Sequence, residues 1–280
     1  MMGSTNDVRP SPIAGTWYSN NAENLRREIA SYLENAVLPD LLGEVIGLIS
    51  PHAGYRYSGP TAGYAYRAVV GKKIDVVAIF SPYHDYTPEK LLTTLHSAYQ
   101  TPLGNIPVAI DLLEEFRKKI KNDELDAAVV AYDKEHSLEI QLPFLQTALK
   151  GTFQLFPLMI RTQDIKEIEI IAKAAGMIFK NKRVLLVAST DLSHFYNEKA
   201  ANNLDKEMLR RIEAFSPEQV LNAERDGKAF ACGAGAVAAV LRTCQLLGAR
   251  KVELLHYSTS AEQTQDFSSV VGYGAAAILR

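Results

Sequence analysis

The sequence has few of the features that mark secreted or membrane-spanning proteins. Only two of its 280 residues are cysteine, so it has no disulfide framework and we expect a reducing compartment, the cytoplasm. The longest stretch without Asp, Glu, Lys or Arg covers residues 91–110 and contains Pro102, Gly104 and Pro107, so it does not predict a membrane span. The first twelve residues lack a basic start followed by an apolar segment, and we expect no signal peptide.

The sequence also lacks an excess of charge of either sign. Thirty basic residues stand against 32 acidic ones, which gives a net charge of −2. Because no basic field would attract polyanions, we expect neither nucleic acid nor a membrane surface as a partner. With 47% hydrophobic and 22% charged residues, the chain can fill and solubilise a core, which excludes intrinsic disorder.

What the sequence does have is an alternation of short apolar segments and helical patterns. The apolar segments are rich in β-branched residues, end in turn signals and predict buried strands. They cover residues 44–50, 75–81, 127–132, 153–160 and 183–189, with further strands expected at 91–99, 251–257 and 268–279. Helical patterns cover residues 23–36, 60–70, 111–121, 137–149, 164–179, 197–214 and 233–247.

This alternation predicts an α/β fold with a mostly parallel central sheet flanked by helices. The last two expected strands follow each other without a long helix, so one edge of the sheet is expected to be antiparallel. No repeat, low-complexity segment or linker interrupts the chain. We therefore expect a single domain over residues 1–280, in which residues 1–20 pack on the core.

Histidines follow four of the expected strands. In an open α/β sheet, ligands bind outside the carboxyl ends of the strands, so side chains there are candidates for function. The four are His52, His84, His136 and His194. The other two histidines, His96 and His256, lie inside expected strands and are interpreted as structural. A chance scatter of six histidines would rarely place four in this one kind of position, which indicates a site.

Residues in the same loops, and one cysteine, are of the types that complete metal sites. Imidazole is the commonest ligand for zinc, iron and copper, and carboxylates or thiolates complete such sites. Residues of these types include His52, His84, Asp191, His194 and Cys232. Their spacing contains no short ligand clip, so the prediction depends on the loops converging at one edge of the sheet.

Cys232 immediately precedes the expected helix over residues 233–247. The positive end of the helix dipole at that place predicts a lowered pKa and favours the thiolate. The alternative is a small buried residue packed in an Ala/Gly-rich helix. Cys244 lies in the middle of the same helix and is interpreted as a core residue.

Motifs for nucleotide binding and for serine hydrolases are missing. GAGAVAA departs from the dinucleotide pattern G-x-G-x-x-G because Ala238 stands at the third glycine position, and PHAGYRYSG lacks the G-K-[ST] of a Walker loop. The serines near His194 are not part of a G-x-S-x-G elbow.

Six segments, in chain order, resemble the Memo family, including its prokaryotic members named AmmeMemoRadiSam system protein B. They are AGTWYS (14–19), SPHAGYRYSG (50–59), SPYHDY (81–86), EHSLEIQLPFL (135–145), STDLSHF (189–195) and ACGAG (231–235). The resemblance covers nearly the whole chain, and it implies a fold similar to that of the LigB-like class III extradiol dioxygenases, with a metal-type pocket.

The resemblance also implies roles for individual residues. The candidate metal ligands are His52, His84 and Cys232, and the ion is iron, copper or zinc. The candidate catalytic residues are His194 as acid–base group, Asp191 beside it, and His136 and Glu139 as nearby pocket groups. Asp191 or Glu139 would orient His194.

One departure from the dioxygenases affects the expected chemistry. Non-haem iron oxygenases use two histidines and a carboxylate, whereas here a cysteine stands in the place of the carboxylate. Three hypotheses therefore stay open: a metal-dependent redox or dioxygenase-like enzyme, a non-catalytic module that binds a small molecule or peptide in the same pocket, and a metal buffer or redox protein.

Overall fold

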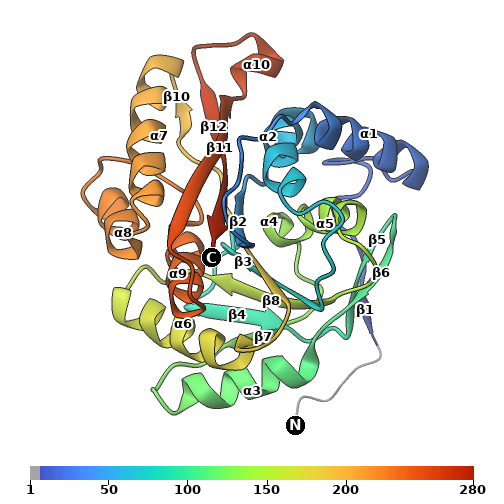
Figure 1. Cartoon of the computed structure of the whole chain (residues 1–280), viewed down its shortest axis with the longest axis vertical. Coiled ribbons are helices and arrows are strands. Elements are labelled where there is room, and N and C mark those ends of the chain that lie inside the picture. The colour runs from blue at the N-terminus through green and yellow to red at the C-terminus, as the bar shows by residue number, and fades with distance from the viewer. Residues whose placement is uncertain (1–6) are drawn as a thin grey trace.

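The computed structural model describes residues 7–280, which form one α/β unit with a central sheet between two layers of helices (Figure 1). The expected fold class is confirmed. The sheet order is β10 (His194–Tyr196), β12 (Val270–Leu279), β2 (Val45–Ser50), β9 (Val184–Ser189), β3 (Val76–Ser81), β8 (Gln154–Ile160), β4 (Leu91–Thr94) and β7 (Ala128–Val130). The edge strand β11 (Lys251–Thr259) pairs with β12.

The centre of the sheet is parallel and its flanks are antiparallel. Strands β2, β9, β3 and β8 all run in one direction. β12 is antiparallel to β2 and to β11, as expected for the last two strands. At the other flank β4 is antiparallel to β8, and β7 is parallel to β4. The sheet is therefore mixed, with a parallel core of four strands.

Helices cover both faces of this sheet, which explains why the central strands are apolar along their whole length. One layer consists of α1 (Ala22–Asn35), α2 (Tyr55–Arg67), α4 (His136–Glu139) and α5 (Leu142–Ala148). The other consists of α3 (Ile110–Lys121), α6 (Ile165–Phe179), α8 (Pro217–Arg225) and α9 (Ala234–Leu246). α7 (Glu198–Glu213) packs on β11, β12 and α8, and α10 (Ala261–Thr264) connects β11 to β12. None of the described helices is long and apolar enough to cross a membrane.

Three expected elements differ from those observed. The helix expected at 137–149 is divided into α4 and α5. The strand expected at 91–99 is divided, because the chain leaves the main sheet after β4 and enters a small second sheet. That sheet contains β1 (Val8–Arg9), β5 (Ala98–Thr101) and β6 (Gly104–Pro107). The helix expected at 60–70 begins five residues earlier, at Tyr55, whose N–H donates to the Trp17 carbonyl.

The N-terminal segment is anchored by a buried arginine. Arg9 is 1% exposed and forms ion pairs with Asp133 and Glu139, whose side chains are only 2% and 0% exposed. It donates a further hydrogen bond to the carbonyl of Glu135. Residues 1–6 of the expected N-terminal segment lie outside the described residues, but Tyr18 is buried in the core. Arg9 thus fixes residues 133–139, which include α4 and the turn before it.

Replacing Arg9 by methionine removes the positive charge but keeps much of the side-chain volume. Because the carboxylate of Glu139 then stays buried without its cation, we expect the free energy of unfolding to fall by about 3–5 kcal/mol. Urea denaturation followed by circular dichroism measures this change. An Arg183→Met variant is the control, because its ion pair with Asp75 is exposed and should contribute little to stability. Equal losses in the two variants would contradict the role of Arg9.

Candidate metal site

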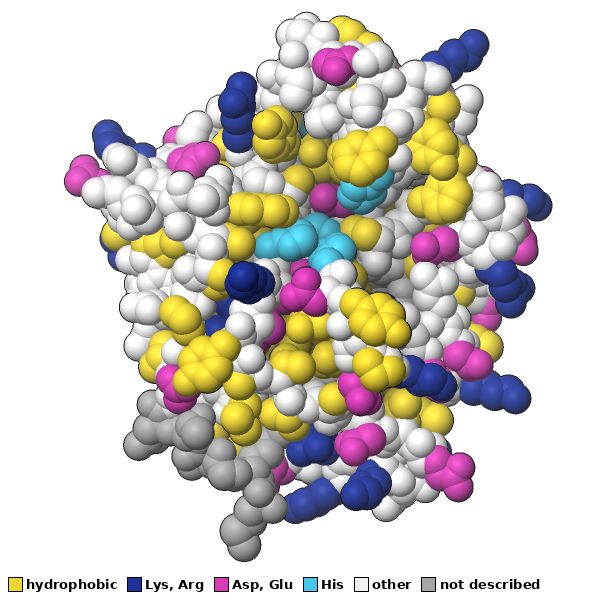
Figure 2. Space-filling view, turned by 180° about the vertical axis from the view of Figure 1, so that it is seen from behind, with side chains coloured by type: hydrophobic (Ala, Val, Ile, Leu, Met, Phe, Trp, Pro, Cys, Tyr) yellow, Lys and Arg dark blue, Asp and Glu magenta, His cyan; other side chains and the backbone are white. Residues whose placement is uncertain are grey.

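Three histidines from separate parts of the chain meet at the carboxyl edge of the central strands. One possible ligand atom each from His52, His84 and His136 lies within 4.8 Å of the other two. His52 is 2% exposed, whereas the side chains of His136 and His84 are 20% and 38% exposed. Figure 2 shows histidine side chains gathered in a hollow of the surface. The group therefore has a protected side and a side open to solvent.

The three histidines are brought to this edge of the sheet in two different ways. His52 and His84 follow β2 and β3, whose carboxyl ends lie at the same edge of the sheet. His136 follows β7, but β7 runs opposite to the central strands, so its carboxyl end points away from the site. The chain turns back over residues 131–135, and α4 packs against β3. The anchoring of this segment by Arg9, not a strand end, positions His136.

Glu135 ties two of the histidines together. Its carboxylate accepts hydrogen bonds from the backbone N–H of His84 at 2.6 Å, from His84 Nδ1 at 2.9 Å and from the N–H of Ser137 at 2.8 Å. Burial alone would raise the pKa of Glu135, but the bonds from His84 outweigh it and lower the pKa to about 2. The ionised carboxylate holds a proton on His84 Nδ1 and so leaves Nε2 to face the site.

Burial and the neighbouring rings keep His52 and His136 neutral, whereas at His84 the hydrogen bond and charge of Glu135 outweigh burial and raise the pKa. Burial lowers the pKa of His52 well below its usual value, and the neighbouring His136 and His84 lower it further. Burial also lowers the pKa of His136 to about 4. Imidazole nitrogens bind metals through their lone pairs, and three imidazoles converging in one hollow fit an ion of the kind that histidine binds, such as zinc, copper or iron.

Cys232 lies directly beside this group. Its Sγ atom is 3.0 Å from His52 Nε2 and accepts a hydrogen bond from the N–H of Asp191 at 3.2 Å. A Cβ atom on Gly233 would lie 2.4 Å from the carbonyl oxygen of Ser189, so the glycine lets the cysteine loop approach β9 closely. The predicted lowering of the Cys232 pKa is wrong, because burial and the nearby Asp191 carboxylate raise the pKa.

Asp191 and His194 flank the group but do not contact each other through their side chains. Asp191 Oδ1 accepts from the N–H of His52 at 2.7 Å, and burial raises its pKa to about 7. His194 Nδ1 lies 2.9 Å from the carbonyl of Leu192, and burial lowers the pKa of His194. Backbone, not the expected carboxylate, therefore orients His194 and leaves its Nε2 free.

Glu139 belongs to a different cluster from the histidines. It is fully buried, and its carboxylate accepts hydrogen bonds from Arg9, Ser11 and Tyr18. The structure thus brings together His52, His84, His136 and Cys232, with Asp191 and His194 adjacent, and engages Glu139 in anchoring the N-terminal segment.

Comparison with known proteins gives the family. Residues 9–277 match the family described as Memo-like protein. The chain belongs to the Memo-like family. It is 34% identical to a MEMO1 family protein of Nitrosopumilus maritimus over 272 residues, and 33% identical to one of Methanococcus vannielii over 283 residues. Each alignment covers 96% of this chain and 98% of the relative. The resemblance inferred from the six segments is confirmed.

Sequence reasoning missed two residues that hold the site of this Memo-like protein. Glu135 stands directly before His136, and its position in the segment EHS was the available signal. Ser189, the last residue of β9, contacts His52 Nδ1 at 3.0 Å. Nothing local in the sequence marks Ser189, because its role depends on β9 lying beside β2.

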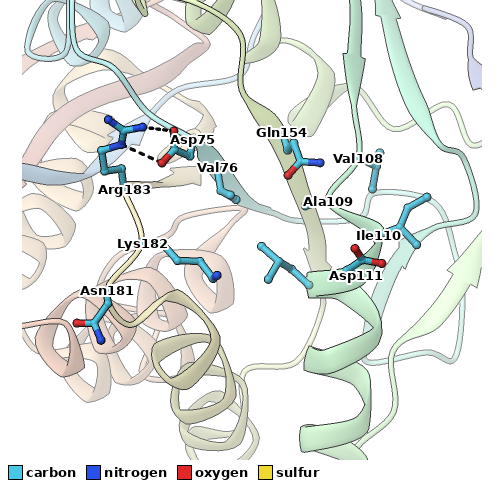
Figure 3. A pocket seen from close by; sticks show the side chains of 11 residues that line it. Asp75, Val76, Val108, Ala109, Ile110, Asp111, Gln154, Asn181, Lys182 and Arg183 are labelled. Atoms are coloured by element: carbon cyan, nitrogen blue, oxygen red, sulfur yellow. Dashed lines mark hydrogen bonds and ion pairs between the residues drawn. The ribbon is translucent and has the colours of Figure 1, made fainter.

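A second hollow lies at the opposite, amino-terminal edge of the sheet. It has a volume of about 910 Å³, and its lining contains no histidine or cysteine (Figure 3). Asp75 and Arg183 form an ion pair on its wall, and both side chains are half exposed. It therefore has none of the crowded, buried titratable groups that distinguish the histidine group.

We expect Gly233→Ala to destabilise the protein by about 1–3 kcal/mol, because the added methyl group would overlap the end of β9. The Cys232 loop must then move away from His52. Urea denaturation measures the first effect, and the rate of thiol labelling of Cys232 in the folded protein, which should rise, measures the second. Gly176→Ala on α6 is the control, because the added Cβ meets only the Leu246 side chain at 3.3 Å. An unchanged labelling rate would contradict the close approach.

Proposed function

We propose that this Memo-like protein binds one iron, copper or zinc ion at the histidine group and, where the ion is iron or copper, uses it in redox chemistry on a small molecule, in the manner of a dioxygenase-like enzyme. The observation that carries the proposal is the convergence of His52, His84 and His136 within 4.8 Å. Nothing else in the described residues groups three potential nitrogen, sulfur or carboxylate ligands so closely.

His52 and His84 are the first two proposed ligands, and the third is either His136 or Cys232. His136 is the third member of the group within 4.8 Å. Cys232 Sγ lies 3.0 Å from His52 Nε2, and the family resemblance assigns Cys232 as a ligand. A thiolate ligand would favour copper(I) or zinc over iron, so the third ligand and the identity of the metal are linked.

A bound ion would supply Lewis acidity and, if it is iron or copper, electron transfer. The chain itself supplies a proton acceptor. His194 donates from Nδ1 to the Leu192 carbonyl, so its neutral form carries the free lone pair on Nε2. Burial keeps His194 neutral near pH 7, which suits a general base that takes a proton from a bound hydroxyl group.

The partner that we propose is a small molecule or a short peptide that enters from the open side of His84 and His136. A net charge of −2 offers no attraction to nucleic acid or an anionic membrane surface. Both cysteines are free, which agrees with a cytoplasmic location.

The first test is the metal content of the protein purified without added metal. We expect about one ion per chain by plasma mass spectrometry, and its loss in His84→Gln, because His84 is the most exposed of the three and its replacement disturbs the core least. His256→Gln is the matched control, since His256 bonds to Thr61 and stacks on Tyr64 away from the site. Metal-free protein that takes up no ion on dialysis would contradict the proposal.

Cobalt(II) substitution identifies the third ligand. If Cys232 coordinates, the loaded protein shows a near-ultraviolet thiolate-to-metal band, which Cys232→Ser abolishes and His136→Gln leaves in place. If His136 coordinates instead, the band is missing from the wild type, and His136→Gln releases the cobalt while Cys232→Ser retains it.

The enzymatic part of the proposal is tested by oxygen uptake of the iron-loaded protein with catechol-type aromatic diols. We expect uptake that falls by about 10²–10⁴-fold in His194→Gln at unchanged iron content, because the proton acceptor is removed. A lack of uptake across a broad panel would reject the dioxygenase-like activity.

A non-catalytic binding module is the second candidate. The observation in its favour is Phe195, which follows His194 and is 76% exposed, as is typical of an aromatic side chain at a recognition surface. Metal-free protein that still binds a small molecule or peptide, with binding lost in Phe195→Ala, would support this candidate over the enzyme.

A further inference from the structure

A chain of fully buried polar groups runs from the core to His52. Tyr66, Gln141, Ser189 and His52 are each exposed by 2% or less. Tyr66 Oη is 2.6 Å from Gln141 Oε1, Gln141 Nε2 is 2.7 Å from Ser189 Oγ, and Ser189 Oγ is 3.0 Å from His52 Nδ1. Water has no access to these groups, so the protein alone decides where each proton lies.

The orientation of the Gln141 amide is fixed by its partners. Gln141 Nε2 is 2.9 Å from the carbonyl oxygen of Pro51, which can only accept a hydrogen bond. The nitrogen therefore faces Pro51 and Ser189, and it donates one hydrogen to each. The amide oxygen accepts from the Tyr66 hydroxyl.

The Ser189 hydroxyl can donate only one hydrogen bond, and it donates this bond to a group other than His52. Ser189 Oγ lies 2.6 Å from the carbonyl oxygen of Ser137, which again can only accept, so the hydroxyl hydrogen points there. The serine oxygen has two lone pairs. One accepts the N–H of Gln141, and the other faces His52 Nδ1. Because the hydroxyl has no second hydrogen, His52 must be the donor in this contact.

We propose that Ser189, held by Gln141 and the Ser137 carbonyl, is a positioning residue that fixes His52 as the Nδ1–H tautomer. The assignment of the tautomer does not depend on the proposed function. Its consequence rests on that function, because the lone pair of His52 Nε2 is then presented to the metal. Cys232 Sγ, at 3.0 Å from that nitrogen, then donates its S–H to the lone pair when no ion is bound. Glu135 holds His84 in the same tautomer by a charged hydrogen bond. A serine hydroxyl at His52 and a carboxylate at His84 therefore both direct an Nε2 atom into the same hollow.

The tautomer is read directly by two-bond ¹H–¹⁵N correlation spectra of the metal-free protein labelled with ¹⁵N-histidine. We expect a protonated Nδ1 and an unprotonated Nε2 for His52 in the wild type. In Ser189→Ala the acceptor at Nδ1 is lost, and we expect the proton to move to Nε2, where it faces Cys232 Sγ. Zinc affinity, measured by competition with a chelator, should fall by about 10–100-fold.

Ser81→Ala is the matched control. Ser81 is the last residue of β3, as Ser189 is of β9, it is equally buried, and its hydroxyl donates only to the carbonyl of Pro82. It should leave both the His52 tautomer and the zinc affinity unchanged.

An Nε2–H tautomer of His52 in the wild type would overturn the inference, and this spectrum decides the matter even if Ser189→Ala does not fold. An unchanged tautomer in folded Ser189→Ala would also overturn it. The spectra contain no metal, so a wild type that shows the Nδ1–H form but takes up no ion would contradict the proposed function while supporting the assigned tautomer.

Discussion

The carboxylate of Glu135 is the interaction on which the site depends. It lies on the segment that turns back after β7, and Arg9 holds that segment from within the core. From there it bonds to both the backbone and the ring of His84 and leads directly into His136. Without these hydrogen bonds of Glu135, the imidazoles of His84 and His136 would lose the contacts that hold them near His52.

Crowding several imidazoles into one partly buried hollow has an electrostatic consequence. Protonated rings would repel one another, and burial removes the water that would stabilise their charge, so His52 and His136 stay neutral. Around them, the protein provides acceptors for the Nδ1 atoms: Ser189 for His52, Glu135 for His84 and the Leu192 carbonyl for His194. The Nε2 atoms are left for a ligand, which is an arrangement that suits metal binding and proton transfer better than structural packing.

The sequence was sufficient for the fold class and for part of the site. Apolar runs identified the buried strands, and the rule that ligands gather at their carboxyl ends correctly brought His52 and His84 together. The same rule included His136 for the wrong reason, because strand direction at the sheet flank has no local sequence signal. Glu139 and the Cys232 pKa show the other limit, since both depend on burial among residues distant in the chain, such as Arg9.

X-ray absorption spectroscopy of the zinc- or copper-loaded protein is the most direct test of the claim that these side chains share one ion. The account predicts at least two imidazole nitrogens at about 2.0–2.1 Å from the metal, with a third nitrogen or a sulfur at about 2.3 Å completing the set. A coordination shell of oxygen atoms without imidazole scattering would contradict it.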